Sequence, residues 1–522
     1  MIYAIVGLRD ATVNDDDDEI QEYEEEDSVQ YADQLNSIGT LGRVDLKYAV
    51  RILSHMLQLR INTLNNCLHL MSTSGRDAVA AKDWAAVNDD IHWLVMITTW
   101  TLTQNNYGER DLIPSEVMKL SITSNPDIGK SMEALKVIEP GTEDANIDPV
   151  VRLIVILLKL CKIEQYVMEN NLQLFSPQVS STLSSFVARF MSGYLLPNEP
   201  DYNEMSMTIV SCFGKDSQVV SEVINFVVGH SLAKIFAWSS ESELKESSSQ
   251  SLVSFASNSP DRCRVLINSP LVVKLVTSHA DSALSQGHVS VQTRKNIYHL
   301  FVLLASQRHD LWEQICNPLK QRYTKLQAAA GARDLSESVR MDLIDFCDTM
   351  IGMTAGVTPA NLSHVWSQFL GVIYQQDAAR LMDVFHNYSE AVVAILEVTS
   401  AVTSRVLCFL EPTETVQFYE ATINVLTVYS KNHNGRSTVE ATSEEESCRD
   451  IELIMQVLND LAAKDFIDWF PSVNENNDQP ATVSAIQVVF LGLNIVMPLM
   501  SAQLLENTKL STLYYKVSCL LA

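Results

Sequence analysis

Residues 150–161 read VVRLIVILLKLC, and apolar side chains occupy nearly every side of a helix drawn through them. Such a helix must be covered by other elements around most of its circumference, because a helix with one solvent-facing side carries a polar stripe. We therefore expect this segment to lie between neighbouring helices in a stack. In a repeat protein, a helix that lies between two neighbouring repeats is covered in this way.

The segments on either side of this stretch carry their apolar residues on one helical face. In residues 335–352 the apolar positions recur every three or four residues, and residues 416–426 and 451–461 repeat this spacing. Short breakers separate the segments, and several have the form Ser, Thr or Glu followed by Pro, which suits a helix N-terminus. These breakers are Ser176-Pro177, Ser259-Pro260, Ser269-Pro270, Thr358-Pro359 and Glu411-Pro412.

The composition agrees with an all-α fold. The chain has 522 residues but only 17 Gly and 15 Pro, too few turn formers for a large β sandwich or barrel. Roughly twenty helices pair with a period of about 40–50 residues, the range of HEAT-type repeats. We therefore predict an α-solenoid of HEAT-like helical pairs over residues 31–522, preceded by an acidic, disordered segment at residues 1–30.

The charge balance narrows the class of partner. Lys and Arg number 37 against 64 Asp and Glu, so the formal net charge is −27. This balance argues against binding to nucleic-acid phosphates and favours basic protein partners. Two acidic groups are best explained as a solvated segment and as charges at a helix N-terminus, and the alternative is an electrostatic contact for basic cargo. Their residues are Asp15, Asp16, Asp17, Asp18, Glu24, Glu25 and Glu26 in one group and Glu444, Glu445 and Glu446 in the other.

No catalytic, cofactor or metal motif is found. The nine cysteines are scattered without a C-x-x-C pair, which favours buried free thiols in a reducing compartment. Gly129-Lys130-Ser131 resembles the end of a phosphate-binding loop, but Ser124 stands where the motif requires Gly. His92 follows Asp89 and Asp90, and we expect a surface or hydrogen-bonded histidine rather than a general base. The sequence therefore predicts neither an enzyme nor a bound cofactor.

One apolar stretch approaches the length of a membrane span. Residues 486–500 are strongly apolar, yet Gln487, Asn494 and Pro498 interrupt them and the run is shorter than the roughly 20 residues that a spanning helix needs. We expect a buried helix there and no membrane insertion. The N-terminus lacks the basic region of a signal peptide.

Several stretches in this order and spacing resemble the exportin-4 family of the importin-β superfamily, and the resemblance runs from about residue 10 to the last residue. The stretches include ADQLNSIGTLGR at 32–43, NDDIHWLVMITTWTL at 88–102, GYLLPNE at 193–199, AWSSESEL at 237–244, YEATINVLTVYSKNHNGR at 419–436, KDFIDWF at 464–470 and MPLMSAQLL at 497–505. They are similar to the central part of the family's chains.

The resemblance implies a nuclear export receptor that binds protein cargo cooperatively with Ran-GTP and shuttles between nucleus and cytoplasm. It also implies contacts with nuclear pore FG proteins, and cargoes such as hypusinated translation factor 5A and Smad-type proteins. The family's Ran-binding N-terminal part is not matched here, and the chain stops inside an apolar helical run at residue 522. We therefore expect a partial chain, truncated at its C-terminal end. The alternative is a free-standing helical-repeat scaffold without Ran dependence.

Overall fold

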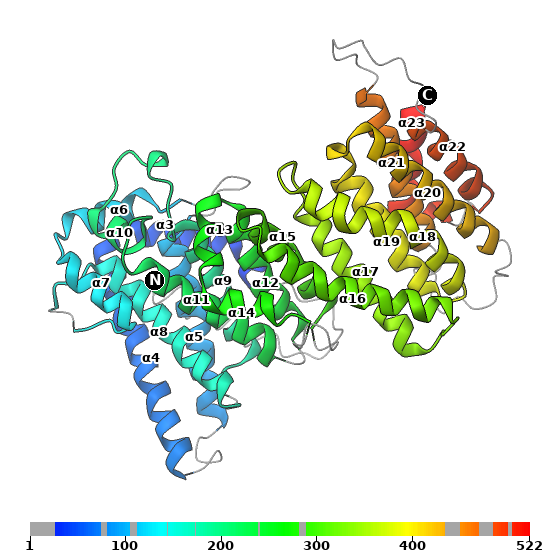
Figure 1. Ribbon diagram of the computed structural model, residues 1–522. Helices are drawn as coiled ribbons and strands as arrows, with labels where there is room; N and C mark the ends of the chain where they lie inside the picture. The colour runs from blue at the N-terminus through cyan, green and yellow to red at the C-terminus, as the bar shows by residue number, and fades with distance from the viewer. Residues whose placement is uncertain are drawn as a thin grey trace. The chain divides into compact units, whose positions relative to one another are not determined.

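The computed structural model describes residues 27–74, 81–104, 112–142, 145–172, 174–238, 241–280, 289–433, 449–468, 484–499 and 504–521. Every regular element within these ranges is a helix, and no strand occurs in them (Figure 1). The predicted all-α class and its helical repeats are confirmed. The chain divides into two compact units, each described here by itself. Unit 1 comprises Met1–Leu275 with His288–Thr293, and unit 2 comprises Val276–Gly287 with Arg294–Ala522.

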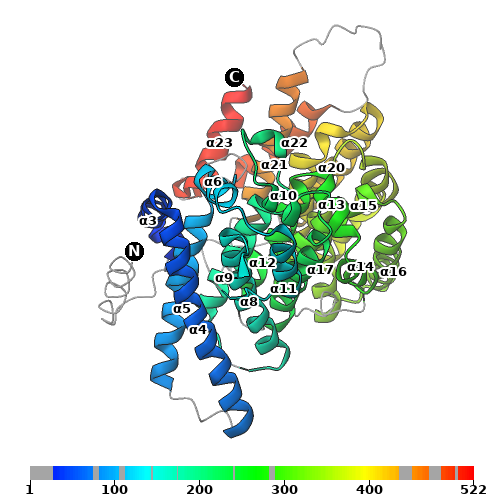
Figure 2. The same cartoon turned by 90° about the vertical axis from the view of Figure 1, so that its left-hand side faces the viewer.

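Unit 1 consists of two layers of helices in which each helix packs against the next member of its own layer. The first layer is α3 (Ala32–Val44), α5 (Ala81–Leu102), α9 (Pro177–Gly193) and α12 (Ser242–Ser257). The second layer is α4 (Leu46–Ser74), α8 (Pro149–Glu169), α11 (Val220–Ala237) and α13 (Pro260–Ile267). Consecutive helices thus alternate between layers, as the HEAT-like pairing predicts. Figure 2 shows the longest of these helices, α4, running beside α5.

Shorter helices complete unit 1. Three of them, α6 (Ser115–Thr123), α7 (Ile128–Val137) and α10 (Met207–Phe213), pack together beside α8. The others are α2 (Asp27–Gln30) and the 3-10 helix η3 (Glu199–Asp201), while α14 (Pro270–Thr277) and α15 (Val291–Gln307) cross the boundary between the units.

Unit 2 repeats the two-layer arrangement. One layer is α17 (Glu337–Ala355), α19 (Ser389–Arg405), α21 (Arg449–Asp468) and α23 (Thr508–Leu521). The other layer is α18 (Gly371–Phe385), α20 (Pro412–His433) and α22 (Ala485–Val496), and α16 (Leu311–Gly331) packs on α17. The π-helix η4 (Ser363–Leu370) leads directly into α18, and the 3-10 turns are η5 (Leu407–Phe409), η7 (Met497–Leu499) and η8 (Leu504–Glu506).

Four of the five predicted Pro breakers begin helices as expected, whereas Pro359 after Thr358 lies in a turn. Pro177 is the first residue of α9, and the Ser176 hydroxyl accepts a hydrogen bond from the Val179 amide at 3.2 Å. Pro260 opens α13 in the same way behind the Ser259 cap. A proline at this position loses no helical hydrogen bond, and the preceding serine satisfies an amide that would otherwise lack a partner.

Helix α8 contains the stretch that predicts the stacking. Ten of its twelve residues from 150 to 161 are buried, and Arg152 and Lys159 supply its only partly exposed positions. Lys159 Nζ lies 2.6 Å from the Glu139 carboxylate at the surface. This burial follows from the position of α8 between α4 and α11 in its layer, with α6 and α7 also packed against it.

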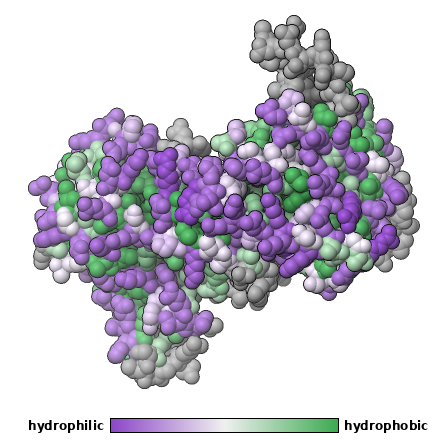
Figure 3. Space-filling view, viewed as in Figure 1, coloured by the Kyte–Doolittle hydropathy of each residue, from purple (hydrophilic) through white to green (hydrophobic). Residues whose placement is uncertain are grey.

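One further helix has the length and composition of a membrane span. Within the described ranges this is α11, and 56% of its apolar window is buried inside the protein. His230 and Lys234 on α11 are fully buried beside a carboxylate, which marks it as a core helix. Residues 485–496 form helix α22, but the prediction of a buried helix holds for one face only, because Ile486 and Phe490 are exposed. On the face shown in Figure 3, hydrophilic side chains predominate over both units.

Two sequence predictions fall mostly outside these ranges. Residues 1–26 of the predicted acidic segment are not among the described residues, whereas its last four residues, Asp27–Gln30, form α2. The acidic triplet at 444–446 also lies outside the described residues.

Candidate protein-binding groove

A groove of about 420 Å³ lies on the first layer of unit 1. Helix α5 contributes four side chains spaced along one face, and α9 contributes five from its first three turns. Helix α2 and the N-terminal turn of α12 complete the wall. The lining residues are Asp27, Ser28, His92, Met96, Thr99, Trp100, Pro177, Gln178, Ser181, Thr182, Ser185, Glu241, Glu243 and Leu244.

The start of α9 is fixed to α5 by side-chain hydrogen bonds to the connection before it. Trp84 Nε1 donates to the Leu174 carbonyl at 2.5 Å, and Asn88 Oδ1 accepts from the Ser176 amide at 3.1 Å. These contacts satisfy backbone groups that the chain exposes between two helices. They hold the first turn of α9, and hence the wall of the groove, against α5.

The groove carries negative charge. Three carboxylates line it, from Asp27, Glu241 and Glu243, and no lysine or arginine stands among the described residues of its lining. Carboxylates without lining cations produce a local negative potential that attracts cationic groups. Hydroxyls of Ser181 and Ser185 add further hydrogen-bonding groups to the α9 wall.

His92 joins three helices at the base of the groove. It is 2% exposed, and its Nδ1 lies 2.6 Å from the Thr182 hydroxyl of α9. Its Nε2 lies 3.0 Å from Asp27 Oδ2 of α2, and Gln178 Nε2 donates to the same carboxylate oxygen at 2.7 Å. The hydrogen bond with His92 lowers the pKa of Asp27 below its usual value, although partial burial opposes this. The expectation of a hydrogen-bonded histidine at position 92 agrees with this geometry.

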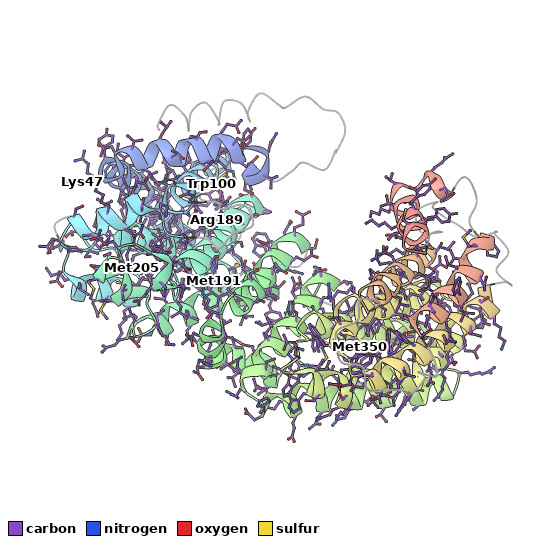
Figure 4. The ribbon with its side chains drawn as sticks, turned by 90° about the horizontal axis from the view of Figure 1, so that it is seen from above. Lys47, Trp100, Arg189, Met191, Met205 and Met350 are labelled. Carbon is purple, nitrogen blue, oxygen red and sulfur yellow. The ribbon has the colours of Figure 1, made fainter. Side chains whose placement is uncertain are left out.

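An apolar floor lies beside the charged groups. Trp100, Met96 and Leu244 are each 4–5% exposed and form this floor. The Arg189 guanidinium stacks over the Trp100 ring, 4.1 Å from its centroid, and Figure 4 shows the two side chains next to each other. An aliphatic stem with a cationic end, as in lysine, matches a floor of this kind with carboxylates at its edge.

A second polar cluster lies in the core of unit 1 and has no access to solvent. His230 Nε2 is 2.6 Å and Lys234 Nζ 3.1 Å from Glu164 Oε2, and all three residues are 0–1% exposed. Lys234 Nζ also donates to the Ser180 carbonyl at 2.5 Å and to the Ser184 hydroxyl at 2.9 Å. Through these contacts the buried cluster ties α8, α9 and α11 together.

The structure does not describe the acidic residues that the sequence analysis proposed as cargo contacts. Asp15–Asp18, Glu24–Glu26 and Glu444–Glu446 all lie outside the described residues, so their contact role stays a prediction. The groove instead gathers Asp27, the last residue of the first acidic run, with Glu241 and Glu243. The sequence at 237–244 shows two acidic residues, Glu241 and Glu243, in alternate positions. Nothing in the neighbouring sequence indicates that these residues lie near α5.

No group of three or more potential metal-binding side chains occurs in the part of the chain that the structure describes. The buried thiols of Cys161, Cys212 and Cys347 have raised pKa values, chiefly because burial disfavours the thiolate, and a protonated thiol is a poor nucleophile.

Comparison with known proteins places the chain in a family. The family model described as Exportin-4 matches residues 8–521. Exportin-4 of Dictyostelium discoideum is 19% identical over 510 residues, covering 95% of this chain but 41% of that relative. The chain thus spans less than half the length of the curated relative it matches. A family match over nearly its whole length, on an all-helical repeat fold, shows that this chain belongs to the exportin-4 family.

Proposed function

We propose that this chain is part of a nuclear export receptor that carries protein cargo from the nucleus to the cytoplasm. The family match over residues 8–521 is the observation that carries the proposal. In the complete receptor, Ran-GTP binds to the N-terminal part of the family's chains, which this sequence does not match. The bound Ran-GTP then strengthens cargo binding. FG proteins of the nuclear pore are the further partners, and no enzymatic reaction is involved.

We further propose that the groove of unit 1 receives a basic segment of the cargo. Its three carboxylates and its lack of lining cations support a positively charged ligand. The apolar floor at Trp100 supports a side chain with a long aliphatic stem. Hypusinated translation factor 5A and Smad-type proteins are cargoes with which this proposal is to be tested.

A direct binding experiment tests the groove. The full chain is titrated into a fluorescein-labelled hexalysine peptide, and the double variant Glu241→Gln with Glu243→Gln is compared with it. Removal of two of the three carboxylates is expected to weaken binding about five- to thirtyfold, from about 0.5–1 kcal/mol for each partly exposed charge. The matched control changes two exposed acids elsewhere in unit 1, Glu116→Gln with Glu133→Gln.

The two double variants have the same net charge, so the comparison separates the groove from non-specific attraction. Equal weakening by both would refute the groove and leave only a general electrostatic effect. The transport role is tested on the complete receptor by measuring cargo affinity with Ran-GTP and with Ran-GDP. Affinity that is independent of the nucleotide would favour the alternative, a helical-repeat scaffold without Ran dependence.

A further inference from the structure

The groove of unit 1 follows two helices, α5 and α9, that run in the same direction. His92 Nδ1 of α5 lies 2.6 Å from the Thr182 hydroxyl of α9. About two turns further along both helices, the Arg189 guanidinium of α9 stacks over the Trp100 ring of α5. The groove therefore has one end at the start of α9 and another at Trp100.

All three carboxylates of the groove lie at the end where α9 begins. Asp27 accepts a hydrogen bond at 2.7 Å from a side chain in the first turn of α9. Helix α12 packs beside α9, and the hydroxyls of Ser184 and Ser248 lie 3.5 Å apart between these helices. Glu241 and Glu243 precede Ser248 by one to two turns, and only the first three turns of α9 line the groove with them. We call this part the acidic end of the groove.

Arginines occupy the opposite end. The Arg189 guanidinium lies 4.1 Å from the centroid of the Trp100 ring, and its Nη1 donates to the Thr103 hydroxyl at 3.4 Å (Figure 4). Arg43 of α3 is buried beneath this end, and its Nη1 donates to the Trp100 carbonyl at 2.8 Å. A guanidinium keeps its charge in a folded protein. This part, which we call the arginine end, is therefore positively charged.

The two ends are far enough apart to act on different groups of one ligand. Gln178 and Arg189 are eleven residues apart on α9, which is about 16 Å at about 1.5 Å per residue. This distance exceeds the Debye length of about 8 Å at physiological ionic strength, so each end attracts its own counter-charge. An extended peptide advances about 3.3 Å per residue and spans the distance in about five residues.

We propose that the groove takes a cargo segment of mixed charge, with basic residues at the acidic end and an acidic residue about five positions away at the arginine end. Arg189 is the residue that determines this preference. The inference rests on the proposed binding of a basic segment and adds a requirement that a uniformly basic segment does not meet. The hydroxyls of Ser181 and Ser185 lie between the two ends and are available to the peptide backbone.

Two peptides of identical composition test the preference. The block peptide has three lysines, two serines and three glutamates in that order, and the alternating peptide carries the same lysines and glutamates in alternation. Both have fluorescein at the N-terminus and are titrated with the full chain at fixed ionic strength. The block peptide should bind about two- to fivefold more tightly, the effect of one partly exposed charge pair. Equal affinities would overturn the inference.

Variants at Arg189 assign the preference to its charge. Arg189→Met keeps a side chain on the Trp100 ring, and it should weaken the block peptide to the affinity of the alternating one. It should also strengthen hexalysine binding by up to about fivefold, a shift of opposite sign that poor folding does not produce. Arg189→Lys retains the cation and should keep the preference. The control Lys130→Met removes an exposed cation elsewhere in unit 1 and should keep it as well.

The results also separate this inference from the proposed function. A block preference that persists in Arg189→Met would refute the role of Arg189, while hexalysine binding weakened by Glu241→Gln with Glu243→Gln would still support the groove. Hexalysine binding that the two glutamate substitutions weaken no more than their control would refute the groove and this inference with it. If Arg189→Met does not fold, the comparison of the two peptides on the unaltered chain still decides.

Discussion

Replacing Lys234 by methionine removes the cation from the buried cluster while keeping the length of the side chain. Lys234 Nζ lies 3.1 Å from Glu164 Oε2 and donates to the Ser180 carbonyl and the Ser184 hydroxyl. The variant leaves a carboxylate that is 0% exposed with His230 as its remaining partner. Breaking a buried ion pair from one side costs about 3–5 kcal/mol, and we expect this loss in the free energy of unfolding at pH 7.5.

The sign of the pH dependence makes the prediction specific. In the unaltered chain, burial first and then the charge of Lys234 lower the pKa of His230, so the folded ring is neutral. The unfolded chain takes up that proton below about pH 6.5, and stability therefore falls as the pH drops through this value. In Lys234→Met the Glu164 carboxylate, 2.6 Å away, favours the imidazolium, and the folded protein gains a proton. The deficit of the variant should therefore shrink by up to about 2.7 kcal/mol between pH 7.5 and 5.5.

Thermal unfolding followed by circular dichroism at these two pH values measures the effect. A unit of this size loses about 2–4 °C of melting temperature per kcal/mol, so a drop of roughly 6–20 °C is expected at pH 7.5. Glu164→Gln combined with Lys234→Met should recover most of it, because no unpaired charge remains. Lys159→Met, at a surface pair, should cost less than about 1 kcal/mol. A drop below 2 °C, or a deficit that grows on acidification, would refute the reasoning.

Three other perturbations follow from the same structure. A Cβ on Gly39 would lie 2.4 Å from the Trp100 carbonyl, so Gly39→Ala should cost about 1–3 kcal/mol in thermal melts, whereas Gly193→Ala, with no atom within 4 Å, should not destabilise. Asp148→Ala removes the side chain that accepts hydrogen bonds from two backbone amides at the start of α8, and should lower the free energy of unfolding in denaturant by about 1–2 kcal/mol. Asp148→Asn should lower it by less, because asparagine can also cap a helix. Amide substitutions at acidic positions 15–18 and 24–26 should slow association with a basic partner and flatten its salt dependence in stopped-flow measurements. Unchanged rates would exclude steering by that run.

The helices and their stacking follow from local sequence, but some irregular elements do not. Residues 150–161 predict a covered helix because almost no position can face water, and Ser176-Pro177 predicts a helix start because cap and proline act within one turn. Leu196-Pro197 and Thr358-Pro359 look similar, yet neither proline opens a helix in the structure. The π-helical turns of η4 widen the start of α18, where Gly371 contacts Trp366, and no periodicity indicated this.

The groove was less predictable for a physical reason. An acidic residue in a degenerate repeat has the same local pattern whether it faces open solvent or a neighbouring helix. Asp27 and His92 meet because α2 lies across the face of α5, and Glu243 joins them because α12 stacks on α9. Trp100 fits a core position equally well. These coincidences depend on the register between helices far apart in sequence, which hydrophobic spacing does not determine.

The buried cluster and the groove lie on two different sides of helix α9. Lys234 reaches across from α11 to the backbone of α9 at Ser180, one residue before the groove-lining Ser181. Because α9 is held by this charge on its buried side and by Asn88 at its first turn, the groove wall has little freedom to move with respect to α5. A layered repeat fold in this way lets the uncharged face of a helix present hydroxyls to a ligand, while hydrogen bonds from a buried lysine fix the position of that helix. Acid then destabilises the buried side of α9, because burial lowers the pKa of His230 and the unfolded chain binds a proton that the folded chain does not.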